Sequence, residues 1–196
     1  MNSPISAMPY KPEYAVPLTQ WWVSAVVVDL NLCPFAASVV KKASIRYSVC
    51  DGDKPDAIIQ AFLAELDLIQ SKPEEELETT LLIAPHTLQD FDQYLDTLDI
   101  LQSLLDRSGL GGEFQLASFH PHYQFDGVDE HDITNWTNRA PFPSFHILRE
   151  GMMSRVLQHY KSPEEIPERN MALMQQLGAK GLIEAYPPFA EYIPQA

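Results

Sequence analysis

The stretch that decides the fold is "SIRYSVCDGDKPDAIIQAFLAELDLIQSKPEEELETTLLIAP", residues 44–85. Residues 44–50 alternate between polar and apolar side chains and include the β-branched Ile45 and Val49, which predicts a strand. After the turn "DGDKP", residues 54–70 carry apolar side chains at helical spacing, namely Ile58, Ile59, Phe62, Leu66 and Ile69. The acidic linker "SKPEEELE" then leads into "TTLLIAP", a continuous apolar run of strand length. The stretch therefore predicts a strand, a helix and a second strand.

The same order continues on both sides. Downstream we expect a helix at residues 88–107, a stop at "GLGG", a third strand at 113–119, a helix at about 145–160 capped by Ser144, and a last helix at about 163–177. Upstream, Thr19 is a fair N-cap for a helix to about Leu30, although its Val-rich middle also fits a buried strand. Pro34 suits the first turn of a short second helix, which places Cys33 at the N-cap position.

Strands that alternate with helices are typical of an α/β domain with crossover connections. We expect a small three- to four-stranded sheet with crossover helices, a long polar loop after the third strand, and two C-terminal helices. Residues 1–17 contain four prolines and are expected to form an extended arm. Residues 18–196 are expected to form a single domain, with an extended aromatic tail from about residue 184.

The net charge of the chain restricts the classes of binding partner that we expect. Its 196 residues include 27 Asp and Glu against 13 Lys and Arg, which is a formal net charge of −14. A surface this acidic repels a phosphate backbone and an anionic bilayer, so we expect neither a nucleic-acid partner nor a membrane partner. Two cysteines do not suggest a disulfide framework, and the N-terminus lacks a secretory signal, which indicates a cytoplasmic protein. Homo-oligomers are compatible with the sequence.

A candidate site lies in "FHPHYQFDGVDEHDITNWTNRAPFPSFHILRE", residues 119–150, which holds four of the six histidines. The segment leaves the end of the third strand, the edge at which parallel α/β sheets bind ligands, and long loops of this kind are more often functional. Arg139 and Arg149 either present guanidinium forks to a carboxylate or phosphate, or pair with acidic side chains. Asn135 and Asn138 either contact that ligand or fix the loop through backbone hydrogen bonds.

Histidine carries the expected chemistry. His146 falls in the first turn of the expected helix, where the helix dipole opposes protonation and a neutral imidazole can act as a general base. Glu150 lies four residues further on the same face, and His120 adds a second polar contact. The alternative is a metal centre, because His120 and His122 point to the same side if the strand continues. With His146 and Glu150 they make a possible ligand set for zinc, manganese or iron.

Cys33 has two interpretations. At a helix N-terminus its thiolate is stabilised, which makes Cys33 a possible nucleophile beside a histidine. Its neighbours Leu30, Leu32 and Phe35 are apolar, however, and a buried cysteine usually behaves as a small hydrophobic residue. We assign Cys50, at a strand end, to the core.

The segments "NLCPF" (31–35), "SFHPHYQF" (118–125) and "NWTNRAPFPSFHILRE" (135–150) give the chain a family resemblance. From about Trp21 onward it resembles a family of bacterial proteins of unknown function, domain of unknown function 1415. Ala140 stands where that pattern has Ser, and His122 is not one of its signature positions. The resemblance implies that the signature positions include Cys33, His120, Tyr123, Asn135, Asn138, Arg139, His146, Arg149 and Glu150.

Three hypotheses follow. The first is an enzyme that binds a small anionic metabolite through Arg139 and Arg149, and its further substrate contacts are Asn135, Asn138 and Tyr123. This enzyme moves protons with His146, Glu150 and His120. Cys33 is an optional nucleophile. The second is a metal-binding protein, and the third is a non-catalytic binding or interaction module. The chain has no Gly-rich phosphate loop, CxxC pair or nucleophile elbow, so its cofactor, if any, is unknown.

Overall fold

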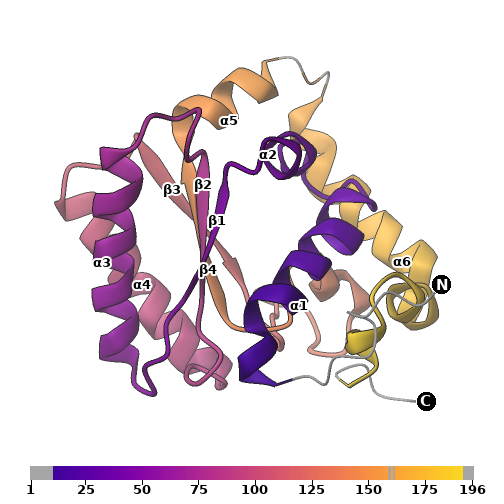
Figure 1. Cartoon of the computed structure of the whole chain (residues 1–196). Helices are drawn as coiled ribbons and strands as arrows, with labels where there is room; N and C mark the ends of the chain where they lie inside the picture. The colour runs from indigo at the N-terminus through magenta and orange to yellow at the C-terminus, as the bar shows by residue number, and fades with distance from the viewer. Residues whose placement is uncertain (1–10, 159, 161, 192–196) are drawn as a thin grey trace.

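The computed structural model describes residues 11–158, 160 and 162–191. Its centre is a sheet of four strands in the order β1-β2-β4-β3 (Figure 1). The strands are β1 (Ile45–Val49), β2 (Thr79–Ile83), β3 (Phe114–Phe119) and β4 (Ser144–Arg149). β1 and β2 are parallel, whereas β4 runs antiparallel to its neighbours β2 and β3. The protein is therefore an α/β protein with a mixed sheet.

The strand–helix–strand unit predicted from residues 44–85 is confirmed as β1, α3 (Pro55–Ser71) and β2. Pro55 sits in the first turn of α3, where its fixed φ favours the helix, and the helix buries Ile58, Phe62 and Leu66. The next helix, α4 (Phe91–Arg107), begins later than residue 88 because Asp90 is its cap: the Asp90 carboxylate accepts a 2.9 Å hydrogen bond from the amide of Gln93.

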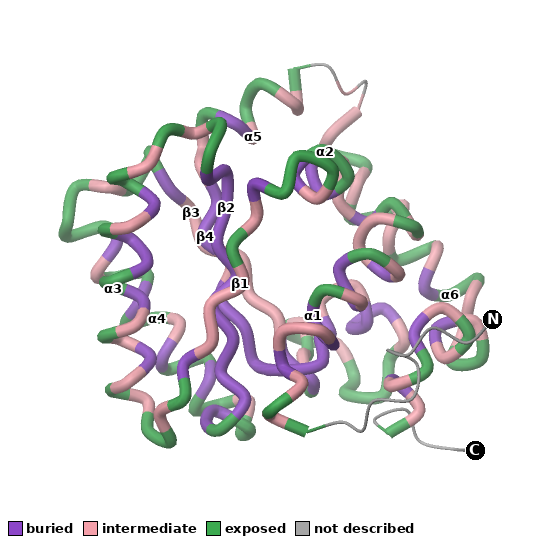
Figure 2. The backbone as a smooth tube through the Cα atoms, viewed as in Figure 1, coloured by how far each residue is buried: buried purple, intermediate pink, exposed green. Residues whose placement is uncertain are grey.

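Helices cover both faces of the sheet. In Figure 1, α3 and α4 lie on one side, and α1 (Ala15–Trp22), α2 (Ala36–Lys42) and α6 (Ile166–Ala185) lie on the other. Because successive strand residues point to opposite faces, Leu82 and Ile147 pack toward α3 and α4, while Leu81 and Ile83 pack toward α1 and α6. All of β2 is buried, and Figure 2 shows the centre of the sheet as mainly buried.

The predicted helix at 145–160 is wrong in its first half. Residues 144–149 form β4, and only the following residues form the helix α5 (Glu150–Leu157). Ser144 is accordingly the first residue of a strand and not a helix cap. β4 pairs on both sides, with β2 and with β3, and its apolar residues Phe145 and Leu148 are also three apart, so its short pattern fits a helix as well as a strand.

The N-terminal prediction is right about helix and wrong about its ends. α1 begins at Ala15 and continues directly as a π-helix, η3 (Val23–Val28), after a short 3-10 turn, η2 (Pro12–Tyr14). Of the extended arm expected over residues 1–17, residues 12–17 instead belong to η2 and α1, and residues 1–10 lie outside the described part. The second helix, α2, has Phe35 as its N-cap, so Cys33 is not the cap but lies in the turn between η3 and α2.

The C-terminal part contains the two expected helices, α5 and α6, joined through a 3-10 turn, η5 (Pro163–Glu165). α6 extends beyond the predicted end at 177 because the chain kinks at Gly178 and continues. The tail expected to be extended from about 184 instead forms a 3-10 turn, η6 (Pro187–Glu191), and residues 192–196 lie outside the described part. Tyr186 and Phe189 are buried, and the Tyr186 hydroxyl donates a 3.0 Å hydrogen bond to the carbonyl of Leu18.

Candidate functional site

Cys33 lies in a turn that α6 holds in place. The turn begins at Asn31, whose φ of 53° is the left-handed conformation that Asn adopts more readily than most residues. Arg169 of α6 donates a 2.6 Å hydrogen bond to the Asn31 carbonyl, and Asn170 donates a 2.8 Å hydrogen bond to the Leu32 carbonyl. The position of the half-buried Cys33 thus depends on a helix more than a hundred residues away in the sequence.

His146 projects from β4 toward the same layer as Cys33, and its ring is oriented by Thr79 of β2. The Thr79 hydroxyl lies 2.6 Å from His146 Nε2 and donates its own proton to the Ile147 carbonyl, also at 2.6 Å. A hydroxyl has a single proton, so Thr79 accepts the bond to His146, and the imidazole proton is on Nε2. This tautomer leaves the lone pair of Nδ1, which has no hydrogen bond among the described residues.

Cys33 and His146 line the same inner cavity, which has a volume of about 60 Å³. The cavity lies between the sheet, η3 and α2, close to the start of α5. Its other walls are apolar apart from Thr79: Trp22, Val23, Val27, Phe35, Ala36, Val39, Ile45, Leu81, Phe119, Leu148 and Met152.

A larger outer hollow of about 590 Å³ adjoins the inner cavity, because Val27, Cys33 and Phe119 line both. Cys33 therefore lies where the two spaces meet. The hollow is bounded by η3, the 120–138 loop and the first turns of α6, and a volume of this size accommodates a small metabolite. None of the described residues that line it is charged, and its polar side chains are Thr134, Thr137, Asn138 and Asn170.

Burial keeps the Cys33 thiol and the His146 imidazole neutral. Burial lowers the pKa of His146 to about 4, so its imidazole is unprotonated at pH 7. Burial raises the pKa of the Cys33 thiol, while hydrogen bonds from the Phe35 and Ala36 amides act in the opposite direction with smaller effect. The cavity thus brings together a thiol that can give a proton and an imidazole that can accept one.

The loop residues singled out in the sequence mainly hold the loop itself. Arg139 is buried, stacks on Trp136 with 4.9 Å between its Cζ and the ring centroid, and donates hydrogen bonds to the carbonyls of Tyr123 and Glu130. Asn135 is fully buried; its side-chain oxygen accepts from the Phe125 amide, and its amide group donates to loop carbonyls. Two of the guanidinium nitrogens of Arg139 are therefore occupied by the loop's own backbone.

Asn138 and Tyr123, two further residues of the loop, lie in different surroundings. The amide of Asn138 donates a 3.2 Å hydrogen bond to the Ser118 carbonyl, and its side chain also lines the outer hollow. The ring of Tyr123 packs against Phe91 and Phe125, with centroid distances of 5.4 and 5.0 Å. Of the substrate contacts expected in this loop, only Asn138 borders the space next to Cys33.

His120 is fully buried and uses both ring nitrogens. Nε2 lies 2.8 Å from the Leu88 carbonyl, to which it donates, and Nδ1 accepts a 3.0 Å hydrogen bond from the His122 amide. Burial lowers the pKa of His120 to about 4. His120 is thus a structural link between the loop and the segment before α4, and it leaves no lone pair for a substrate or metal.

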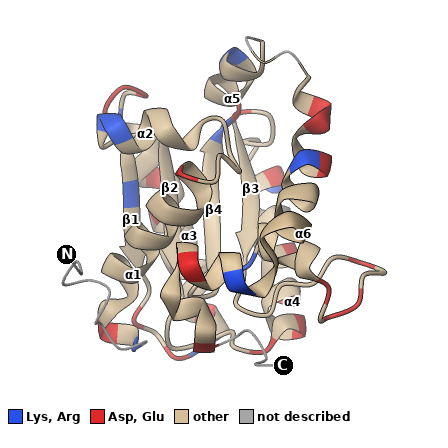
Figure 3. Cartoon of the chain, turned by 90° about the vertical axis from the view of Figure 1, so that its right-hand side faces the viewer, with Lys and Arg blue, Asp and Glu red and all other residues tan. Residues whose placement is uncertain are grey.

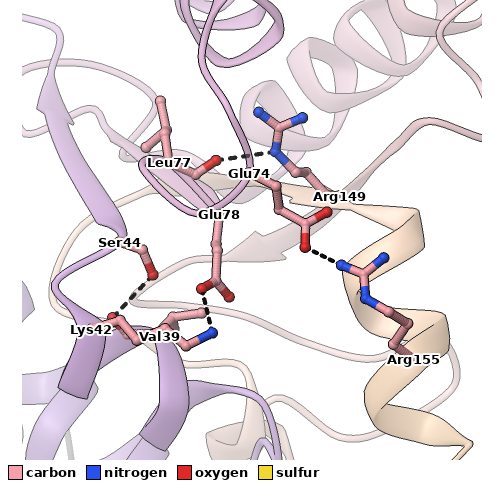
Figure 4. A network of polar contacts seen from close by, with 8 residues as sticks. All are labelled: Val39, Lys42, Ser44, Glu74, Leu77, Glu78, Arg149 and Arg155. Atoms are coloured by element: carbon pink, nitrogen blue, oxygen red, sulfur yellow. Dashed lines mark hydrogen bonds and ion pairs between the residues drawn. The ribbon is translucent and has the colours of Figure 1, made fainter.

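Arg149 and Glu150 lie apart from His146. The Arg149 guanidinium donates hydrogen bonds to the carbonyls of Ile69 and Lys72 at the end of α3 and of Leu77 before β2, and Figure 4 shows the contact with Leu77. Glu150 is the first residue of α5, so it does not share a helical face with His146 of β4.

The surroundings of Arg149 contain ion pairs rather than a ligand site. Figure 4 shows Lys42 paired with Glu78 at 2.8 Å and Arg155 paired with Glu74. The anion-anchoring role expected for Arg149 thus has no geometric support, because its guanidinium is occupied by backbone carbonyls.

The metal alternative lacks a ligand cluster. Within the part of the chain that the structure describes, no three His, Cys, Asp or Glu side chains are grouped so that they could hold a metal ion. His120, His122, His146 and Glu150 come from the loop, the middle of β4 and the start of α5, and the rings of His120 and His122 are 5.9 Å apart between centroids.

Several residues of the site were not found by sequence reasoning. The sequence places Thr79 in a strand and Arg169 and Asn170 in a helix but does not reveal their contacts with His146 and the Cys33 turn, because these contacts join distant parts of the chain. The π-helix η3 had a usable signal in its Val-rich sequence, which was ambiguous between helix and strand. π-Helical turns often occur at functional sites.

Charge is spread over the surface away from this site. Figure 3 shows acidic residues on several helices and loops, whereas basic residues occur at the end of α2 and on β1, among other places. Among the described helices, none has both the length and the apolar composition needed to cross a bilayer.

The fold and the site define an α/β protein with a thiol and an imidazole in one buried cavity. The DUF1415 family, described as "Protein of unknown function", matches residues 15–184, and the chain therefore belongs to this family. No curated protein and no solved structure matches the chain.

Proposed function

We propose that the protein is an enzyme that binds a small neutral molecule in the outer hollow and acts on it with Cys33 as nucleophile and His146 as base. One observation carries this proposal: Cys33 and His146 line one cavity at the base of a hollow large enough for a metabolite. A nucleophile, a base and a third group that orients the base are the recurring parts of nucleophilic catalysis, and Thr79 takes the third role.

The reaction begins with proton transfer from the Cys33 thiol to Nδ1 of His146. The products are a thiolate and an imidazolium, opposite charges that attract each other more strongly in an apolar cavity than in bulk water. His146 keeps its Nε2 proton throughout and donates it to the Thr79 hydroxyl oxygen, so the ring keeps its orientation. The neutral lining of the outer hollow favours an uncharged substrate over the anion expected from the sequence.

Alkylation kinetics test this proposal. Iodoacetamide is a small neutral electrophile, and peptide mapping separates its reaction at Cys33 from its reaction at Cys50, which is buried in the core on the other face. We expect the rate at Cys33 to saturate with reagent concentration, because binding precedes reaction, and His146→Gln to lower it at least about 100-fold.

A matched pair of variants isolates the role of Thr79. Thr79→Val removes the acceptor that orients His146 and should slow alkylation about tenfold. Thr80→Val makes the same change one residue along β2, at a buried hydroxyl without a hydrogen bond among the described residues, and should leave the rate unchanged. A linear, non-saturating rate that does not depend on His146 would show that Cys33 is an ordinary thiol and would overturn the proposal.

A further inference from the structure

The inner cavity limits what can lie beside the Cys33 thiol. Its volume is about 60 Å³, and a protein cavity of about 150 Å³ holds a benzene molecule. In proportion, about two or three carbon atoms fit. The walls next to this space are the side chains of residues such as Val23, Leu81 and Leu148, so the group that enters is apolar and short.

The outer hollow accommodates a different kind of group. Thr134 and Thr137 use their hydroxyl protons within the loop and can still accept hydrogen bonds, while Asn138 and Asn170 each use one amide proton and keep another. A larger, neutral group with its own donors and acceptors fits these side chains. The substrate therefore has a short apolar end and a polar end, with the reacting atom between them at Cys33.

We propose that the substrates are short-chain acyl compounds, with an acyl group of two or three carbons in the inner cavity and the leaving group in the outer hollow. This inference rests on the proposed nucleophilic role of Cys33. Acyl transfer fits the site because a thiol and an imidazole are sufficient for it and water completes the cycle.

The reaction consists of acylation of Cys33 and hydrolysis of the resulting thioester. Cys33 Sγ forms a bond to the acyl carbon, the bond from that carbon to the leaving group breaks, and the thiol proton passes through His146 Nδ1 to the leaving group. Water then adds to the thioester carbon, the carbon–sulfur bond breaks, and the sulfur regains a proton. The net reaction converts the acyl compound and water into a short carboxylic acid and the free leaving group.

The test uses the full-length protein with p-nitrophenyl acetate, propionate, butanoate and hexanoate, measuring p-nitrophenol release and the acyl adduct on the Cys33 peptide by mass spectrometry. We expect kcat/KM for the acetate or propionate ester to exceed that for the hexanoate ester at least about tenfold, because each methylene that a small apolar cavity cannot hold costs about tenfold or more. A rate that rises steadily with chain length would overturn the inference.

Variants of the cavity wall sharpen the test. Met152→Ala enlarges the inner cavity and should shift the preferred ester to a longer chain. Met174→Ala removes the same atoms from another buried site, outside both cavities, and should leave the preference unchanged. Ala36→Val instead reduces the volume of the inner cavity and should restrict the preference to the acetate ester. This variant tests the cavity if Met152→Ala does not fold. Equal chain-length profiles in wild type, Met152→Ala and Ala36→Val would contradict the assignment of the cavity.

Iodoacetamide alkylation separates this inference from the proposed function. If Cys33 is alkylated in a His146-dependent manner but none of the esters acylates it, the acyl inference is wrong and the thiol–imidazole pair stands. If Cys33 reacts with neither reagent, both are wrong.

Discussion

His120 and His146 are neutral at pH 7 for the same reason, burial, but they use their nitrogens differently. Both ring nitrogens of His120 are hydrogen-bonded to backbone groups, whereas His146 uses only Nε2, which is hydrogen-bonded to Thr79. A histidine that is satisfied at both nitrogens ties two segments together. A histidine with a remaining lone pair, next to a cavity and a thiol, is available for chemistry. This difference gives His120 a structural role and supports the proposal that His146 acts as a base.

Both histidines should make the protein less stable in acid. Each has a pKa of about 4 in the folded protein, against about 6.5 in the unfolded chain. The unfolded state thus binds more protons between these values, so stability is lost as the pH falls from 6.5 toward 4. Between pH 7 and pH 5 each histidine should lower the free energy of unfolding by about 2 kcal/mol.

Urea unfolding of His146→Gln at both pH values checks this expectation. The variant should lose about 2 kcal/mol of the pH dependence, while His131→Gln, which changes an exposed histidine, should keep all of it. If His146→Gln kept the wild-type pH dependence, His146 would not be an enclosed neutral group.

Arg149 illustrates an arginine whose partners are carbonyls. Its fork donates to the carbonyls of Ile69 and Lys72, where α3 ends, and of Leu77, before β2. Arg149→Met should therefore lower the free energy of unfolding by about 2–4 kcal/mol, because buried acceptors lose a charged donor. Arg107→Met, at the exposed end of α4, should change it by less than about 0.5 kcal/mol. Denaturant unfolding measures both, and a similar small change in both variants would contradict the structural role of Arg149.

At the scale of elements, β1, α3, β2, α4 and β3 were predictable because each has a local signal. Alternation marks β1, and apolar spacing with Pro55 at its start marks α3. β4 was not predictable from its residues, because the spacing of Phe145, Leu148 and Met152 fits a helix as well as that of Phe145 and Ile147 fits a strand. Pairing of β4 with β2 and β3, which decides between the two, depends on residues far away in the sequence.

The kink in α6 gives an element-scale prediction. Gly178 has φ 58° and ψ −174°, a combination that residues with a Cβ adopt only under strain, and a Cβ built there meets nothing within 4 Å. Gly178→Ala should therefore destabilise the protein by about 1–3 kcal/mol through the backbone alone. Gly151→Ala, in the first turn of α5 at an ordinary φ, is the matched control and should stabilise by up to about 1 kcal/mol.

Thermal or urea unfolding of the two alanine variants decides the point. Destabilisation by Gly178→Ala and stabilisation by Gly151→Ala would confirm the kink. Stabilisation by Gly178→Ala would show that α6 runs straight through this position.

At the scale of the whole molecule, the site is assembled from segments that the sequence keeps apart. Cys33 and His146 were each recognisable as reactive residue types, yet their common cavity depends on β4, η3 and α6 meeting on one face of the sheet. The expectation that residues 119–150 form one site rests on the place of this loop after the third strand and on its many ionisable residues. Instead, Arg139, Asn135 and His120 satisfy the loop's own backbone, as irregular segments require.

The layered arrangement predicts where the molecule opens last. β2 and β4 are the central strands with both faces covered, whereas β1 and β3 are the edges. Native-state hydrogen exchange should show amides of β2 and β4 exchanging at least about tenfold more slowly than those of β1 and β3, because the central strands open only when the whole sheet does. Protection of β1 equal to that of β2 would contradict a terminal position for β1 in the sheet.

The most direct test of the thiol–imidazole pair is the pH dependence of Cys33 alkylation in wild type and His146→Gln. If Cys33 and His146 act together, the wild-type rate should be nearly constant between about pH 6 and pH 8, since the pair ionises by internal proton transfer. In His146→Gln the thiol ionises alone, and the rate should rise about tenfold per pH unit. A wild-type rate that rises with pH as steeply as that of His146→Gln would contradict the account.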